Sequence, residues 1–343
     1  MLLFYSLSLA LFSLCPFWCS VSAKRYIVQN NFPPRLQWEA NHGYCGEVSL
    51  LSFGLANGQY LSQYDSRVAV CGTGKRVQSE CQMLLSDNDQ TGANNMHFVN
   101  EEWDPYGNGT PQQFLSWAKQ RIAAGYLVIT GLFMNYCQFD EYCDEDHGDP
   151  DFDHIVNLIG FTSSHPISDR NFYPDDELII DDHGLYYEDK YNIPYIFKIK
   201  FSDLINDRVG ANNVNSPTYS LPDRICYGIT LKGLKADGAY PIRLMTSVNF
   251  EKPVMKEGAN QRPPPMPMTL RLTISGLTAG TSYTLLTYND LRQVPESDFM
   301  SPTQITKAMA RTDFIATSDV QVIDKVPIRS DQTVIYRCVK TVN

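Results

Sequence analysis

Positive charge is scarce in this sequence. Its 28 Lys and Arg residues are outnumbered by 38 Asp and Glu residues, and the formal net charge is −10. No run of Lys or Arg interrupts this acidic average. The phosphate backbone of a nucleic acid or an anionic membrane surface would be repelled by such a field. The composition therefore predicts no nucleic-acid partner.

Long apolar runs are equally scarce. Only residues 1–23 approach the ~18 apolar residues that a membrane span requires. The stretch ends in Val21-Ser22-Ala23, a small-x-small cleavage sequence. We interpret it as a signal peptide and expect a protein that is secreted or enters the lumen of the secretory or lysosomal pathway. The lack of a preceding basic residue, and Pro16 inside the run, keep an uncleaved anchor as the alternative.

Metal-ligand spacings are missing as well. The histidines other than His154 show neither an i, i+4 pair nor a Cys-x-x-Cys partner, so we expect no metal and no cofactor. The acidic segment 140–153 offers carboxylates that calcium prefers, but it lacks the order of an EF-hand loop. We interpret this segment as a solvated loop, with calcium binding as the alternative. Its negative field beside His154 would favour cationic substrates.

What the sequence does contain is an odd number of cysteines. Two of its nine lie in the signal segment, and the remaining seven are Cys45, Cys71, Cys81, Cys137, Cys143, Cys226 and Cys338. In an oxidising compartment six of seven tend to pair. Short loops close at little entropic cost, which predicts the pairs Cys71–Cys81 and Cys137–Cys143 and leaves Cys226 with Cys338. Cys45 is then the free thiol, unless the pairing differs.

The pattern of apolar residues divides the chain into two domains. Residues 24–215 mix helical and strand patterns, whereas residues 216–343 consist mostly of strands separated by Gly, Pro and Asn turns. Residues 268–288 predict a β-hairpin of a sandwich. We therefore predict an α+β domain, followed by an all-β sandwich-like domain that would bind substrate or a partner.

Within the first domain, apolar spacing predicts a helix over 46–55, directly after Cys45. A second helix is expected over 111–124, because Thr110 is a favourable N-cap and Pro111 a favourable first residue. Strands are expected at 126–133, 154–161, 178–181 and 195–201.

Three residues of this domain form a candidate catalytic set. Cys45 lies at a helix start, where the unpaired N–H groups and the helix dipole stabilise a thiolate. His154 begins an apolar strand and is the expected general base. Asp181 ends another strand and would orient the imidazole. Asp182 remains the alternative, because neighbouring strand residues face opposite sides and the register is not visible from sequence.

These motifs resemble those of papain-like cysteine peptidases. Gly43-Tyr-Cys-Gly-Glu47 is similar to their nucleophile turn, His154-Ile-Val-Asn-Leu-Ile-Gly-Phe161 to their histidine strand, and Ile179-Ile-Asp-Asp-His-Gly184 to the segment of their orienting Asn. The resemblance implies that Cys45 is the nucleophile, His154 the general base and acid, and Asp181 the orienting residue. It also implies that the side chain of Gln37, with the Cys45 N–H, stabilises the oxyanion.

The chain departs from papain in three ways. Gln37 lies eight positions before Cys45, further than in papain, and the orienting residue is Asp rather than Asn. The residues between Lys24 and Gln37 are too few for a papain-type inhibitory propeptide. The pattern is closest to the bacteriocin-processing, double-glycine leader peptidase-like branch. Residues 276–283 weakly resemble a fibronectin type III motif.

The expected function is that of a secreted cysteine peptidase that cleaves amide bonds of a protein or peptide substrate through an acyl-enzyme. A transglutaminase-like acyl transferase is the alternative with the same chemistry. A papain-like binding protein without activity is the other alternative, suggested by the spacing of Gln37. Asn108-Gly-Thr110 is an N-glycosylation sequon, so a glycoprotein is expected.

Overall fold

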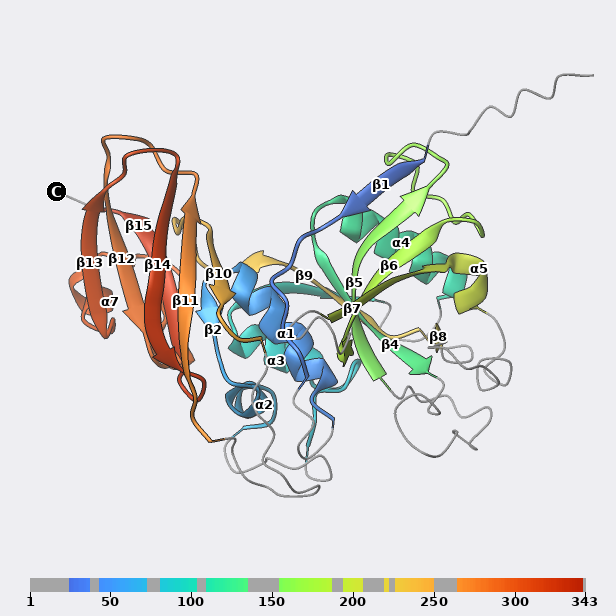
Figure 1. The fold of residues 1–343 in the computed structure, drawn as a ribbon, viewed down its shortest axis with the longest axis horizontal. Helices are drawn as coiled ribbons and strands as arrows, with labels where there is room; N and C mark the ends of the chain where they lie inside the picture. Colours follow the sequence, from blue (N-terminus) through green and yellow to red (C-terminus); the bar gives the residue numbers. More distant parts are fainter. Residues whose placement is uncertain are drawn as a thin grey trace, which may run out of the picture.

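The computed structural model describes residues 25–37, 43–72, 81–103, 109–134, 154–186, 194–205, 219–221, 226–249 and 264–341. These residues form two sheet-rich units that lie side by side (Figure 1), and the α+β class is confirmed. The signal segment, the Cys137–Cys143 pair, the acidic segment 140–153 and Asn108 lie outside the described residues. No helix among the described residues is both long and apolar enough to cross a bilayer.

The N-terminal unit is built on an eight-stranded antiparallel sheet. Its main order is β3 (Phe98–Glu102), β9 (Gly228–Leu234), β4 (Leu127–Met134), β5 (His154–Ser163), β6 (Glu177–Tyr186) and β7 (Pro194–Lys200). Strand β1 (Tyr26–Gln29) also pairs with β5, and β8 (Tyr219–Ser220) with β4. Every residue of β5 is buried, which explains its nearly continuous apolar sequence, because both faces of the sheet are covered.

Helices cover the two faces of this sheet. The helices are α1 (Cys45–Ala56), α2 (Gln63–Cys71), α3 (Asp89–Asn95), α4 (Pro111–Ala123) and the short α5 (Phe201–Leu204). Apolar residues of α1 pack with Ile155 and Ile179, whereas those of α4 pack with Val156 and Ile180, so the two helices lie on opposite faces. Both predicted helices are confirmed, and Thr110 caps α4 through a capping box with Gln113.

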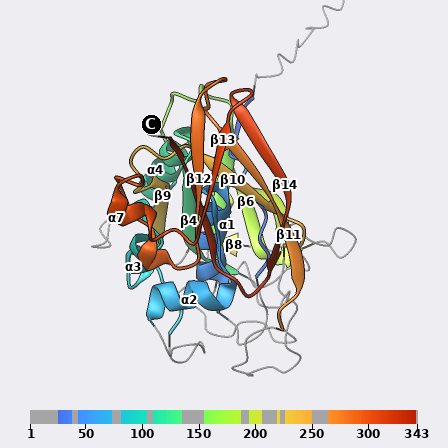
Figure 2. The ribbon, with the colours of Figure 1, turned by 90° about the vertical axis from the view of Figure 1, so that its left-hand side faces the viewer.

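The C-terminal unit is a sandwich of a three-stranded and a four-stranded sheet (Figure 2). The first has the order β10 (Ile242–Thr246), β11 (Pro267–Ser275), β14 (Val320–Arg329). The second has the order β13 (Ala310–Ile315), β12 (Ser282–Tyr288), β15 (Val334–Lys340), β2 (Gln59–Tyr60). The short η3 (Leu291–Gln293) and α7 (Pro302–Ile305) connect β12 to β13.

The predicted hairpin over 268–288 is wrong. Strand β11 pairs with β10 and β14, whereas β12 pairs with β13 and β15, so the two strands belong to opposite sheets. The alternation of apolar residues predicted for the two strands is nevertheless confirmed, since Leu270, Leu272 and Leu285 all face the shared core. The turn between them crosses from one sheet to the other instead of closing a ladder.

The boundary predicted between residues 215 and 216 lies too early. Strand β9 pairs with β3 and β4, so residues 228–234 belong to the first sheet. The sandwich begins with β10, and it also takes β2 from the N-terminal unit, since Tyr60 pairs with Val334. Leu55 and Tyr60 lie in the sandwich core. The two units therefore share α1 and β2 rather than meeting at a linker.

The cysteines are only partly as predicted. The Cys71–Cys81 disulfide is confirmed, with 6.1 Å between the Cα atoms. Cys226 and Cys338 are free and buried in separate cores, Cys226 with α4 and Cys338 inside the sandwich, so their predicted bridge is wrong. Cys45 is thus one of three free thiols in the described part of the chain, and counting alone does not single it out.

A buried ion pair joins α4 to the segment that precedes β6. Lys119 Nζ lies 2.6 Å from Asp176 Oδ2, and both side chains are at most 1% exposed. The Lys119 ammonium also lies 5.3 Å from the centroid of the Phe161 ring and 5.2 Å from that of Tyr173. Removing one partner would leave a buried charge without its counter-ion.

We expect Lys119→Met to lower the free energy of unfolding by about 3–5 kcal/mol, because Asp176 stays buried and unpaired. The double variant Lys119→Met/Asp176→Leu should recover most of this loss. Urea unfolding measures both. Arg25→Met is the matched control, since the Arg25–Glu177 pair is exposed and its loss should cost below about 1 kcal/mol. Equal losses in Lys119→Met and Arg25→Met would contradict the assignment.

Candidate functional site

Cys45 is the first residue of α1, as the sequence predicted. Gly43 has φ +61°, a left-handed conformation that glycine adopts without strain, and it turns the chain into the helix. A Cβ atom at Gly46 would lie 2.8 Å from the backbone oxygen of Met83, so the helix start packs directly against residue 83. The turn at Gly43 and the close packing at Gly46 thus fix the place of the thiol.

A second buried ion pair holds this turn. Arg67 Nε on α2 lies 2.8 Å from Glu47 Oε1, and both side chains are fully buried. Arg67 also donates to the Gly43 carbonyl and stacks on the Tyr44 ring, 3.7 Å from its centroid. Glu47 accepts in addition from the Met83 N–H at 3.1 Å. Arg67 therefore contacts the two residues before Cys45, as well as Glu47 in the first turn of the helix.

Burial raises the pKa of Glu47 above its ordinary value, while Arg67 and the Met83 N–H act in the opposite direction. A carboxylate in the first turn of a helix is also favoured by the helix dipole. This pair could not be predicted from the sequence, because its members are 20 positions apart on different helices. Glu47 therefore has a structural partner on another helix.

His154, the first residue of β5, is bound to Asp182 on the adjacent strand β6. Its Nε2 lies 2.8 Å from Asp182 Oδ1, which also accepts from the Gly184 N–H at 2.9 Å. Burial opposes the charged imidazolium, but the charge and hydrogen bond of Asp182, with a hydrogen bond and charge from Cys45, raise the pKa of His154 to about 10. His154 therefore interacts with both the predicted nucleophile and a carboxylate.

The preference for Asp181 over Asp182 is corrected. Asp181 pairs with Asn157 across the sheet and points to the opposite face from its neighbour. It is 4% exposed, and its Oδ1 has no hydrogen-bond partner among the described residues. Burial and the nearby Asp182 charge raise the pKa of Asp181 to about 7. Asp182 is the carboxylate that orients His154.

Gln37 lies beside His154 in spite of its irregular spacing. Its N–H donates to the His183 carbonyl at 2.8 Å, which holds it at the end of β6. A Cβ atom at Gly184 would be 3.1 Å from Gln37 Oε1 and 3.0 Å from His154 Cε1, so both side chains pack over this glycine. Residues 38–42, which connect Gln37 to the turn before Cys45, lie outside the described residues.

Ser49 and His183 are members of the site that the sequence did not indicate. Ser49 is one turn after Cys45 and donates to its carbonyl at 3.0 Å. The same Oγ lies 2.9 Å from His183 Nε2, and the His183 ring is edge-on to His154 with 5.6 Å between centroids. His183 is a single histidine after Asp181 and Asp182 on β6, and no sequence pattern indicates that it contacts α1. Only the folded structure brings its side chain to that helix.

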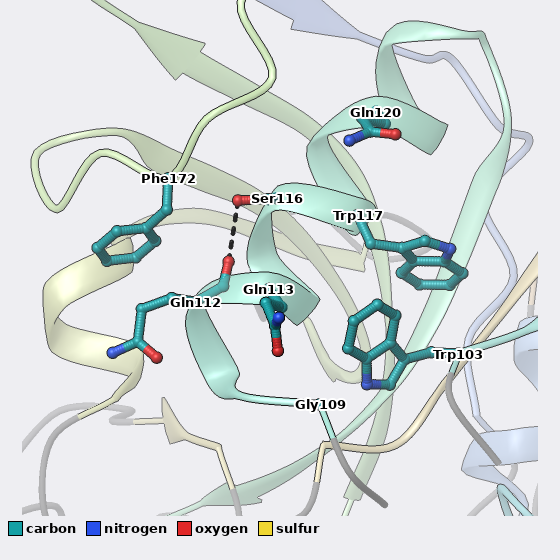
Figure 3. A pocket seen from close by; sticks show the side chains of 8 residues that line it. All are labelled: Trp103, Gly109, Gln112, Gln113, Ser116, Trp117, Gln120 and Phe172. Carbon is teal, nitrogen blue, oxygen red and sulfur yellow. Dashed lines mark hydrogen bonds between the residues drawn. The ribbon is translucent and has the colours of Figure 1, made fainter. Parts of the chain in front are cut away.

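A separate hollow opens over α4 (Figure 3). Its cavity volume is about 740 Å³. Aromatic rings and amide side chains line it, contributed by Trp103, Gly109, Gln112, Gln113, Ser116, Trp117, Gln120 and Phe172. None of the residues around Cys45 belongs to it. In the described part of the chain, no group of three or more His, Cys, Asp and Glu side chains is placed to hold a metal ion.

Comparisons with known proteins add no relative. The chain matches no protein-family model, no curated protein and no solved structure. The geometry around Cys45 therefore carries the functional argument.

We expect Asp182→Asn to lower the pKa of His154 by at least about one unit, because the neutral amide no longer stabilises the imidazolium. Asp181→Asn, the matched control one residue away, should change it far less. The ¹³Cε1 resonance of His154, followed by NMR against pH, measures both values. A larger shift in Asp181→Asn than in Asp182→Asn would restore the sequence-based preference.

Asp181 should also make stability depend on pH. Its pKa is raised from 3.8 to about 7, so the folded state holds this proton more tightly than the unfolded chain does. Its contribution to stability is present below pH 3.8 and is lost as the pH rises to about 7. We compare the free energy of unfolding of Asp181→Asn with that of the wild type by urea unfolding at pH 5 and at pH 8. We expect the advantage of the variant to increase by more than about 1 kcal/mol from the lower to the higher pH. An equal difference in the free energy of unfolding at both pH values would show that the pKa of Asp181 is not raised.

Proposed function

We propose that this chain is a secreted cysteine hydrolase of papain-like fold that cleaves amide bonds in peptides. One observation carries the proposal: His154 binds Asp182 through Nε2 at 2.8 Å and at the same time interacts with the Cys45 thiol at the start of α1. A thiol, an imidazole and an orienting carboxylate in this sequence of contacts are what nucleophilic catalysis by cysteine requires.

Electrostatics support a charged resting state. The raised pKa of His154 means that its ring is an imidazolium at neutral pH. A neighbouring cation and the N-terminus of a helix both favour thiolate over thiol. Cys45 has both neighbours, because it begins α1 and contacts His154. A thiolate beside an imidazolium is the form of the pair that nucleophilic attack requires.

The geometry supports a two-step reaction. The Cys45 thiolate attacks the amide carbonyl carbon and forms a C–S bond, while the carbonyl oxygen becomes an oxyanion. The Cys45 N–H and the Gln37 side-chain amide are the donors for this oxyanion. As the C–N bond breaks, His154 gives its proton to the leaving amine. Since Asp182 holds Nε2, Nδ1 is the ring nitrogen left for this transfer.

In the second step the now neutral His154 takes a proton from water, and the hydroxide equivalent attacks the thioester carbon. The C–S bond breaks, the acid is released and the thiolate and imidazolium are restored. Asp182 keeps the ring in place through both steps, since it is fully buried and also held by the Gly184 N–H.

Other features support the compartment and the branch. The Cys71–Cys81 disulfide fits an oxidising compartment, in agreement with a signal peptide at residues 1–23. A nucleophile helix packed on an antiparallel sheet that carries the histidine fits a papain-like domain. The orienting Asp182, in place of the Asn of papain, favours the double-glycine leader peptidase-like branch.

We expect the wild-type protein to cleave members of a fluorogenic peptide library and Cys45→Ala to lose at least ~10³-fold in rate. At pH 7, iodoacetamide should label Cys45 but spare Cys226 and Cys338, because burial raises the pKa of each of these two thiols to about 12. Peptide mapping by mass spectrometry identifies the labelled thiol. Cys226→Ala is the control and should keep the labelling of Cys45.

An unlabelled Cys45 in the folded wild type would contradict the proposal. So would equal peptide cleavage by the wild type and Cys45→Ala, since the cleavage would then come from elsewhere.

A further inference from the structure

His183 contacts three separate parts of the site. Its side chain is bound to Ser49 on α1 at 2.9 Å, and its backbone carbonyl accepts from the Gln37 N–H at 2.8 Å. Its ring lies edge-on to the His154 ring, with 5.6 Å between centroids and 69° between planes. At 1% exposure, it is enclosed between β6 and the nucleophile helix.

The hydrogen bonds define where the proton of His183 lies. A serine hydroxyl carries one hydrogen, and that of Ser49 goes to the Cys45 carbonyl at 3.0 Å. Toward His183 the Ser49 oxygen must therefore accept, so His183 donates from Nε2. Its Nδ1 has no hydrogen-bond partner among the described residues. The ring is then the neutral Nε2–H tautomer.

The surroundings keep the ring neutral. The charged groups that act on it are His154 on β5 and Asp182 on β6, and Asp181 precedes Asp182 on β6. Burial and the His154 charge lower the pKa of His183 to about 3, against the opposite effect of Asp182. A second cation beside the His154 imidazolium would be repelled by it. At neutral pH the His154 ring is thus a cation, whereas the adjacent His183 ring is neutral.

We propose that His183 is a positioning residue: as a neutral donor to Ser49, it ties the helix that carries Cys45 to the strand that carries Asp182. The inference rests on the proposed thiolate–imidazolium pair. The connection runs from the Cys45 carbonyl through Ser49 to His183, whose neighbour in the chain is Asp182. It fixes the thiol relative to His154 without touching substrate.

The test compares two substitutions at the same position. His183→Gln keeps an amide donor near the Nε2 position, whereas His183→Phe keeps a ring against His154 and removes the donor. Ser49→Ala breaks the same connection from the other side with a smaller change in volume, and it serves if His183→Phe does not fold. Circular dichroism and urea unfolding confirm that each variant is folded.

The main measurement is the iodoacetamide alkylation rate of Cys45 as a function of pH. We expect the midpoint of this profile to rise by about one pH unit in His183→Phe and in Ser49→Ala, because a displaced imidazolium stabilises the thiolate less. His183→Gln should stay near the wild type. The double variant His183→Phe/Ser49→Ala should add little to either single change.

With a cleavable peptide, His183→Phe should lower kcat and leave KM nearly unchanged, since His183 does not contact substrate. Wild-type alkylation profiles in folded His183→Phe and Ser49→Ala would overturn the inference, as would a His183→Gln profile like that of His183→Phe. The alkylation profile needs no substrate. If no peptide is cleaved but the profile shifts as expected, peptide hydrolysis fails and the positioning role stands.

Discussion

The buried ion pair of Arg67 and Glu47 is the interaction on which the rest of the site depends. Glu47 is in the first turn of α1, and Arg67 reaches from α2 to that carboxylate, to the Gly43 carbonyl and to the Tyr44 ring. A buried pair of this kind adds little net stability but is costly to break, so it fixes geometry more than it strengthens the fold. Here the geometry that it fixes is the position of Cys45.

Helix α1 is surrounded by protein, since ten of its twelve residues are buried, its polar Glu47, Ser49 and Ser52 among them. One side packs on β5 and β6, which supply His154 and Asp182, and its C-terminal end reaches the sandwich through Leu55. Strand β2, which follows directly, completes a sheet of the sandwich. The second unit thereby supports the helix that carries Cys45, so the two units pack together around α1.

The sequence predicted those parts of the site that depend on local signals. Capping and apolar spacing located α4 and α1, and an apolar strand located His154. Pairings between distant segments could not be predicted. The sheet register, including a bulge between Leu158 and Gly160, decides that Asp182 rather than Asp181 faces His154. The wrong pairing of Cys226 with Cys338 has the same cause. Nothing local in the sequence indicates that β9, which follows Cys226, belongs to the first sheet, and this places Cys226 in a different core from Cys338.

The proposed chemistry requires a protonated His154 beside Cys45, while the adjacent His183 stays neutral. The ¹⁵N NMR spectrum of the histidine rings in the folded wild type at pH 7 tests it most directly. We expect both ring nitrogens of His154 to be protonated and His183 to carry a proton on Nε2 only. A neutral His154 ring, or a doubly protonated His183, would contradict it.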